Sequence, residues 1–296
     1  YHCWKKRGHG IVDLKSAMKQ SCDTYFYEIA RKLGVDRLKE TSIKFGLGEK
    51  VLNETFSIEK KGLIPDTKWK KNNLGKGWVI GETLITGIGQ GYTQTTPLQL
   101  CQMTAQLANG GFKIYPKIIV EEDSKTSEEI KIIMNKNRKQ LYKKDSRLKD
   151  TTEELLGFLD KKEHETLFKS SKNIDLVREA MFASTNEIRG TSYKSRIDDP
   201  KYQFAGKTGT SQVKRITEAA RELDLSTSEI PYNERDHALY IAFGPYKNPR
   251  YALSIVIEHG GSGSSAAAPI AKKLFKLIID RHEEREKIRK EKLLKI

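Results

Sequence analysis

Three apolar segments near the end of the chain constrain its fold more than any other feature. They are YQFAGKTGTSQV (202–213), HALYIAFGPY (237–246) and RYALSIVIEHGG (250–261), and polar residues separate them. Apolar runs of this length are typical of neighbouring strands in one sheet. Helical segments precede these strands and a helix follows them. This order predicts an α+β fold with an antiparallel sheet.

The spacing of apolar residues predicts the helices. Residues 11–20 and 23–38 carry apolar side chains at helical intervals, with Gly34 as the expected stop of the second helix. Residues 46–97 are richer in glycine and proline, which predicts a loop. Pro97 after Thr96 indicates the first turn of another helix. We expect its buried side to hold Leu98, Cys101, Ala105 and Ala108.

A short motif inside the first predicted strand carries the clearest chemical signal. Lys207, Thr208, Gly209 and Thr210 form a K-T-G-T sequence, and a glycine within a strand often marks close approach of another backbone or a ligand. K-T-G is the third element of the S-x-x-K, S-x-N/D and K-T-G set of penicillin-interacting serine enzymes. The second element is matched by Ser21-Cys22-Asp23, at the start of a predicted helix.

Longer segments extend this match. WKKRGHG (4–10), SCDTYFYEIARKLG (21–34), GIGQGYTQTTPLQL (87–100), NGGFKIYPKI (109–118), AGKTGTSQV (205–213) and RDHALYIAFGPY (235–246) together resemble the transpeptidase domain of the penicillin-binding protein 2 family, the class B peptidoglycan D,D-transpeptidases. The resemblance covers most of residues 1–118 and 178–280. It implies the penicillin-binding, serine β-lactamase-like α+β fold, in which flanking helices and a helical lobe surround an antiparallel sheet.

The same resemblance implies the domain organisation. Residues 1–280 would be the C-terminal part of a transpeptidase domain, interrupted by a highly charged insertion at about 121–172. Residues 281–296 form a basic C-terminal tail, which we expect to be frayed.

The resemblance also implies catalytic roles for Ser21, Asp23, Lys207, Thr208, Gly209 and Thr210. Lys207 would place positive charge beside the Ser21 hydroxyl, which relays a proton to the leaving amine. Lys207, Thr208 and Thr210 would bind the terminal carboxylate of the donor peptide, and the Thr210 N–H would form half of the oxyanion hole. Gly209 would let the stem peptide add as an edge strand. For Asp23, capping of the following helix is an equally open role.

The nucleophilic serine is missing from this assignment. In the resembled family its Ser-x-x-Lys lies before the WKKRGHG segment, so we expect it upstream of residue 1. Four Ser-x-x-Lys strings occur in the chain, starting at Ser16, Ser57, Ser146 and Ser211. Ser16 lies too close to Ser21 for two motifs that must converge from separate helices. The other three lie outside the resemblance or on the K-T-G strand, so we expect this chain alone to be inactive.

For the parent protein the resemblance implies a serine-type D-Ala-D-Ala transpeptidase or carboxypeptidase that cross-links peptidoglycan during cell elongation. Stem peptides and β-lactams would be its ligands, and membrane proteins of the elongation machinery its partners. An upstream anchor would hold it at the bacterial inner membrane with the catalytic domain in the periplasm. The alternative is a catalytically inactive fragment that acts as a scaffold or partner-binding module of that machinery.

The net charge of +15 is compatible with an anionic partner, since 54 Lys and Arg residues stand against 39 Asp and Glu residues. The basic residues are scattered among acidic ones, and no recognition motif indicates binding of nucleic acid. We therefore expect no nucleic-acid partner.

Cys3, His9 and Cys22 form a second constellation, with the spacing C-x5-H-x12-C. Thiolate and imidazole groups are good zinc ligands, and a structural zinc site needs a fourth, here expected to be a carboxylate upstream. The serine chemistry itself requires no cofactor, so this zinc would be structural. Two alternatives are a buried free thiol at Cys22 beside a solvated His9, and a Cys3–Cys22 disulfide.

Overall fold

The computed structural model describes residues 1–52, 58–118, 165–214 and 225–295. The chain divides into two compact units, Tyr1–Pro116 with Thr166–Lys276, and Lys117–Glu165 with Leu277–Ile296. The first unit contains all three described strands, the Ser21-Cys22-Asp23 sequence and the K-T-G sequence. Most of the predicted insertion at 121–172 lies outside the described residues. In the described part of the chain, no helix combines the length and apolar character that a membrane span requires.

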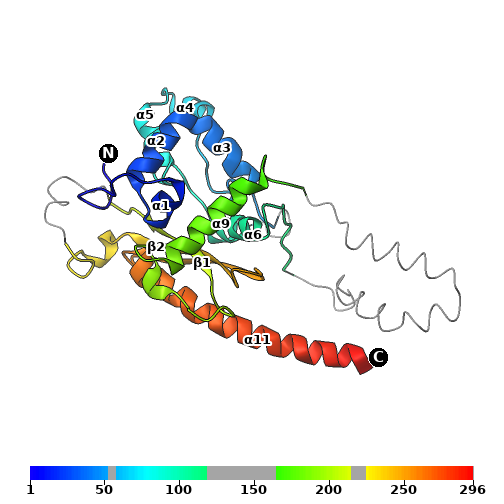
Figure 1. Cartoon of the computed structure of the whole chain (residues 1–296). Coiled ribbons are helices and arrows are strands. Elements are labelled where there is room, and N and C mark those ends of the chain that lie inside the picture. The colour runs from blue at the N-terminus through cyan, green and yellow to red at the C-terminus, as the bar shows by residue number, and fades with distance from the viewer. Residues whose placement is uncertain (53–57, 119–164, 215–224, 296) are drawn as a thin grey trace, which may run out of the picture. The chain divides into compact units, whose positions relative to one another are not determined.

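The described residues form a sheet of three strands in the order β1–β2–β3, and its antiparallel pairing is as predicted (Figure 1). They are β1 (Ala205–Ser211), β2 (His237–Gly244) and β3 (Tyr251–Ile257). The register pairs Lys207 with Ile241 and Gly209 with Leu239. The K-T-G sequence therefore lies on β1, at one edge of the described sheet.

Helices cover both faces of this sheet. α6 (Pro97–Ala108) contacts β2 and β3, and α9 (Ser171–Asn186) contacts β1. The π-helical turn η4 (Gly263–Ala267) and the start of α11 (Ala268–Lys295) lie on the other side (Figure 1). There Phe275 of α11 stacks on Phe204, with 4.8 Å between the ring centroids. The result is the layered α+β arrangement that the order of elements predicts.

A buried polar network lies between β2 and α9. The Tyr240 hydroxyl is 2.9 Å from Thr185 Oγ1 and donates to Ser192 Oγ at 3.0 Å. Burial raises the pKa of Tyr240 to about 12, so this hydroxyl stays protonated at physiological pH. Because each buried hydroxyl has a partner, the network anchors the sheet to α9 without an unpaired polar group.

The helical lobe contains α1 (Leu14–Lys19), α2 (Asp23–Leu33), α3 (Val35–Lys44), α4 (Thr67–Leu74) and α5 (Ile80–Thr86). Gly34, with φ of 79°, separates α2 from α3, as its expected role as a helix stop requires. The short turns η2 (Tyr193–Ser195) and η3 (Tyr232–Glu234) complete the described elements. The prediction of a loop over 46–97 is wrong in part, because α4 and α5 lie within it.

One further expectation holds only in part and another is wrong. Ala108 on α6 is buried as expected, but the other buried residues of this helix are the polar Gln99, Thr104 and Gln106, and Leu98 is 38% exposed. Gln99 is satisfied in the interior because its Nε2 donates to two loop carbonyls. The basic tail is helical as far as Lys295 rather than frayed, since it consists almost entirely of Lys, Arg, Glu and Leu, which favour helices.

Candidate active site

Ser21 occupies the turn between α1 and α2 in a left-handed conformation, with φ of 52°. Trp4 holds this turn from outside. Its indole Nε1 donates to the Ser21 carbonyl at 2.8 Å, and its backbone N–H donates to the Asp23 carboxylate at 2.9 Å. A non-glycine residue in this conformation costs about 1–3 kcal/mol and persists only where its surroundings impose it. The contacts of Trp4 supply part of that restraint.

The structure brings the second and third motifs into direct contact. Lys207 Nζ donates to Ser21 Oγ at 2.6 Å and to the Thr208 carbonyl at 2.9 Å. Ser21 belongs to the helical lobe and Lys207 to the sheet, so the contact lies at the junction of the two. The positive charge that the sequence predicts beside Ser21 is therefore in place, and the catalytic roles of both residues stay predictions.

Burial lowers the pKa of Lys207 to about 8, although the nearby Asp23 carboxylate acts in the opposite direction. An amine with this pKa is mostly protonated at neutral pH and loses its proton as the pH rises through about 8. Lys207 can therefore act as a cation near pH 7, in a setting where its charge is easily removed.

The two threonines of the motif have different surroundings. Thr208 Oγ1 lies 3.0 Å from Thr191 Oγ1, which follows α9. Thr210 is exposed, and its carbonyl accepts a hydrogen bond from Gln90 Nε2 at 2.6 Å. Sequence reasoning missed Thr191 and Gln90. Gln90 lies in the GIGQG segment that supports the resemblance, whereas no signal marks Thr191.

Gly209 does lie where another backbone comes close, but that backbone belongs to the chain itself. A Cβ on Gly263 would stand 2.6 Å from the Gly209 carbonyl oxygen and 3.2 Å from its nitrogen. The η4 turn therefore packs directly on β1 behind the motif. The expectation that a stem peptide approaches along the strand stays a prediction.

Asp23 is not the cap of α2. Cys22 occupies the N-cap position, no side chain caps the helix there, and the Asp23 carboxylate accepts from the Trp4 N–H instead. The capping role considered for Asp23 is therefore wrong. Its position in the first turn still places a negative charge at the positive end of the helix dipole.

The Ser-x-x-Lys strings do not form a second serine centre in the described residues. Lys19, three residues after Ser16, forms an ion pair with Glu187 at 2.9 Å. Lys214, three residues after Ser211, pairs with Glu234. The strings at 57 and 146 begin outside the described residues.

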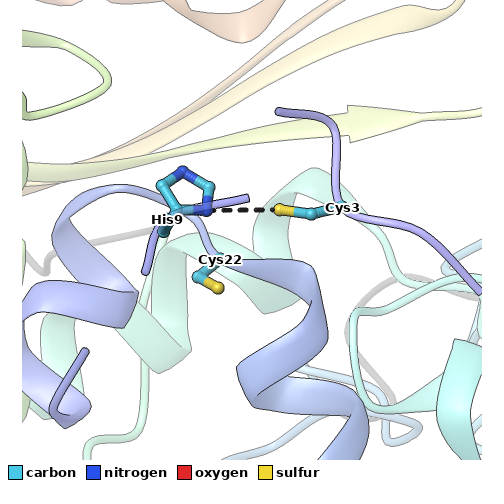
Figure 2. Close-up of side chains that lie close together, drawn as sticks. All are labelled: Cys3, His9 and Cys22. Atoms are coloured by element: carbon cyan, nitrogen blue, oxygen red, sulfur yellow. Dashed lines mark hydrogen bonds between the residues drawn. The ribbon is translucent and has the colours of Figure 1, made fainter. Parts of the chain in front are cut away.

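Cys3, His9 and Cys22 converge beside this site (Figure 2). Their ligand atoms all lie within 4.8 Å of one another, and Cys3 Sγ is 3.4 Å from His9 Nδ1. Both cysteines are buried free thiols, so the structure contains no Cys3–Cys22 disulfide. Cys22 is a buried free thiol, as the first alternative expected, whereas His9 is half-buried and its Nε2 is buried without a hydrogen-bond partner.

This donor set is suited to zinc. Burial lowers the pKa of His9, which favours the neutral imidazole that binds metals. Burial raises the pKa of the Cys3 thiol, and a bound metal would have to displace that proton. Among the described residues, no fourth His, Cys, Asp or Glu joins the cluster.

The fold, the Ser21–Lys207 contact and the K-T-G edge strand together define a domain of the penicillin-interacting serine transpeptidase class. The chain belongs to the family described as the penicillin binding protein transpeptidase domain, whose model matches residues 1–276. This match confirms the family and the fold expected from the sequence.

Individual relatives agree with this family. The chain is 34% identical over 283 residues to the peptidoglycan D,D-transpeptidase MrdA of Salmonella typhimurium, covering 95% of the chain and 40% of the relative. The MrdA of Acinetobacter baumannii is 33% identical, covering 92% of the chain and 35% of the relative. The chain thus spans well under half the length of these relatives.

Two solved structures share the fold. One is Pseudomonas aeruginosa PBP2 in complex with WCK 5153, with a TM-score of 0.69, 34% identity, and coverage of 94% of this chain and 51% of that chain. The other is the Helicobacter pylori complex between PBP2 and MreC, with a TM-score of 0.69, 28% identity, and coverage of 96% and 42%.

Proposed function

We propose that this chain forms part of the active site of a peptidoglycan D,D-transpeptidase. The parent protein would cross-link stem peptides through a serine acyl-enzyme and would be a target of β-lactams. The contact of 2.6 Å between Lys207 Nζ and Ser21 Oγ gives the strongest support, because it joins two motifs from opposite ends of the chain. The MrdA relatives are named peptidoglycan D,D-transpeptidases, which supports the same reaction for this protein.

In the proposed reaction, a serine of a Ser-x-x-Lys motif outside residues 1–296 gives its proton to the lysine of that motif and attacks the carbonyl carbon of the penultimate D-Ala. The amide bond to the terminal D-Ala breaks, and the leaving amine takes a proton relayed through the Ser21 hydroxyl. Lys207 stabilises this relay and holds the terminal carboxylate by charge. The Thr210 N–H would stabilise the developing oxyanion, a contribution that commonly amounts to a few kcal/mol in acyl transfer.

The proposal extends to location and partners. A D,D-transpeptidase acts on peptidoglycan, so the catalytic domain would work in the periplasm, beside the bacterial inner membrane. The H. pylori relative forms a complex with MreC, which supports a partner from the elongation machinery for this protein as well.

The full reading frame that encodes this sequence provides the test. We expect fluorescent penicillin to label the purified product covalently, and mass spectrometry to place the acyl group on a serine outside residues 1–296. The Ser21→Ala and Lys207→Ala variants should be labelled more slowly. A folded product that is never labelled would overturn the proposal and favour the inactive scaffold.

A structural zinc at Cys3, His9 and Cys22 is the second part of the proposal. These residues flank Trp4 and the turn that presents Ser21, so a metal would tie the first ten residues to that turn. Its contribution would be to rigidity, because the serine reaction needs no metal chemistry.

Metal analysis separates this site from adventitious binding. Reduced protein prepared without chelator should carry close to one zinc per chain, and Cys22→Ser should lose it. Cys101→Ser is the matched control, because Cys101 is also a free thiol but lies outside the cluster. Zinc near background in the unmutated protein, or equal zinc in both variants, would rule the site out.

A further inference from the structure

The loop between α5 and α6 lies directly on α2. A Cβ added at Gly87 would stand 2.3 Å from the Ala30 Cβ and 3.3 Å from the Phe26 carbonyl oxygen, so the chain at Gly87 packs closely against α2. Gly89 and Gly91 have φ of 77° and 76°, a left-handed conformation that suits glycine. Gln90 stands between these two glycines, on a backbone that the contact with α2 holds in place.

From this loop, the Gln90 side chain reaches the K-T-G strand. Its Nε2 donates to the Thr210 carbonyl oxygen at 2.6 Å, across 120 residues of sequence. This bond joins the helical lobe to the strand that carries the third motif. It lies one residue beyond Gly209.

The Thr210 carbonyl points away from β2, as neighbouring contacts show. A Cβ on Gly263 would stand 2.3 Å from the Leu239 oxygen and 3.2 Å from the Gly209 nitrogen, so these two atoms lie together between the strands. Backbone groups alternate in direction along a strand. The carbonyls of Thr208 and Thr210 therefore both face the edge of β1 that no described strand covers.

Side chains occupy both of these carbonyls. The Thr208 oxygen accepts from Lys207 Nζ at 2.9 Å, and the Thr210 oxygen accepts from Gln90 Nε2. A peptide that adds to this edge as a strand must donate its own N–H groups to the same oxygens. In the free protein, side-chain donors thus occupy the two carbonyl oxygens that the backbone of a bound peptide needs as acceptors.

We propose that Gln90 is a positioning residue that holds the Thr210 carbonyl in the free protein and releases it to the backbone N–H of an incoming stem peptide. Peptide binding is then coupled to rotation of the Gln90 side chain away from β1. This inference rests on the proposed function, and it adds a residue and a conformational step to that site.

The consequence for affinity has a definite sign. Binding in the unmutated protein exchanges one hydrogen bond for another, whereas Gln90→Ala leaves the Thr210 carbonyl free to accept at once. Gln90→Ala should therefore bind diacetyl-Lys-D-Ala-D-Ala about two- to tenfold more tightly than the unmutated protein, which is the effect of one hydrogen bond of ordinary net strength. Gln102→Ala is the matched control, because Gln102 Nε2 donates to the Ile114 carbonyl instead of to β1. It should leave the affinity unchanged.

NMR titration of the 296-residue chain with this peptide tests the inference. In the unmutated protein, the Gln90 side-chain amide signal, assigned by its absence in Gln90→Ala, should move toward the position of a free glutamine as the peptide saturates. The Lys207 Cε signal should shift in the same titration, since the peptide carboxylate binds there. Affinity should rise in Gln90→Ala and stay constant in Gln102→Ala.

The outcomes distinguish the role of Gln90 from the proposed function. Shifts at Lys207 with an unmoved Gln90 amide, or an affinity that Gln90→Ala leaves equal or lowers, overturn the role of Gln90 while the proposed function stands. Absence of any shift at Lys207, Thr208 and Thr210 at saturating peptide overturns the proposed function, and the role of Gln90 with it.

Discussion

Lys207 is proposed to support both the proton relay through Ser21 and the binding of a substrate carboxylate. Its ammonium contacts Ser21 Oγ, and burial lowers its pKa to about 8. Removal of the amine should therefore affect both the proton relay and the binding of a carboxylate.

In the parent protein, we expect Lys207→Ala to slow acylation by β-lactams about 10- to 100-fold. A hydrogen bond to a charged group is worth about 1.5–3 kcal/mol, and each 1.4 kcal/mol is tenfold in rate. Lys207→Arg keeps the charge but changes its shape, so it should recover only part of the rate. Stopped-flow acylation provides the measurement, with circular dichroism as a check on folding. Equal rates in the unmutated protein and Lys207→Ala would end the catalytic assignment.

The same residue predicts a pH dependence of stability. The folded pKa of about 8 lies below the ordinary lysine value of about 10.4, so the unfolded chain binds more protons between these limits. The free energy of unfolding should therefore gain about 1–3 kcal/mol from this group as pH rises from 8 to 10.5.

Urea denaturation across this pH range checks the prediction, with Lys207→Met as the comparison. The difference in free energy between the two proteins should grow with pH in favour of the unmutated chain. Parallel pH profiles would show that the pKa of Lys207 is not lowered.

At the scale of elements, the packing of η4 on β1 depends on the absence of a side chain at Gly263. A Cβ there would stand 2.3 Å from the Leu239 oxygen and 2.6 Å from the Gly209 oxygen, and both are backbone atoms that cannot move alone. Gly263→Ala should therefore push the turn away from the strand and destabilise the protein by about 1–3 kcal/mol.

Gly77→Ala is the matched control, because a Cβ at Gly77 would meet nothing within 4 Å. Thermal or urea unfolding should leave this variant close to the unmutated protein. If Gly263→Ala were equally stable, the close packing of η4 on β1 would be wrong.

The elements also show what the sequence could and could not predict. Local sequence signals predict the three strands, the end of α2 at Gly34 and the start of α6 at Pro97. Each of these signals lies within one short segment of the chain. The polar interior of α6 was not predictable, since Gln99 is buried only because carbonyls of distant loops accept from it. The contact of Lys207 with Ser21 was expected through the resemblance, but that of Gln90 with Thr210 depends on tertiary packing alone.

At the scale of the whole molecule, the described residues contain matches to the second and third of the three motifs. Within the described residues, the Ser-x-x-Lys strings form no serine centre. We therefore expect residues 1–296 alone to form no covalent adduct with fluorescent penicillin on a denaturing gel. A labelled band that disappears in Ser16→Ala would show that Ser16 is the nucleophile after all. The parent protein, labelled in parallel, is the positive control.

The occupied edge of β1 also bears on how the chain behaves at high concentration. An uncovered strand edge is a template on which identical chains can pair and grow into aggregates. On β1 the two outward carbonyls described above already accept from Lys207 and Gln90, so a second copy finds no free acceptor at either position. These two hydrogen bonds therefore also disfavour self-assembly of the free protein through this edge.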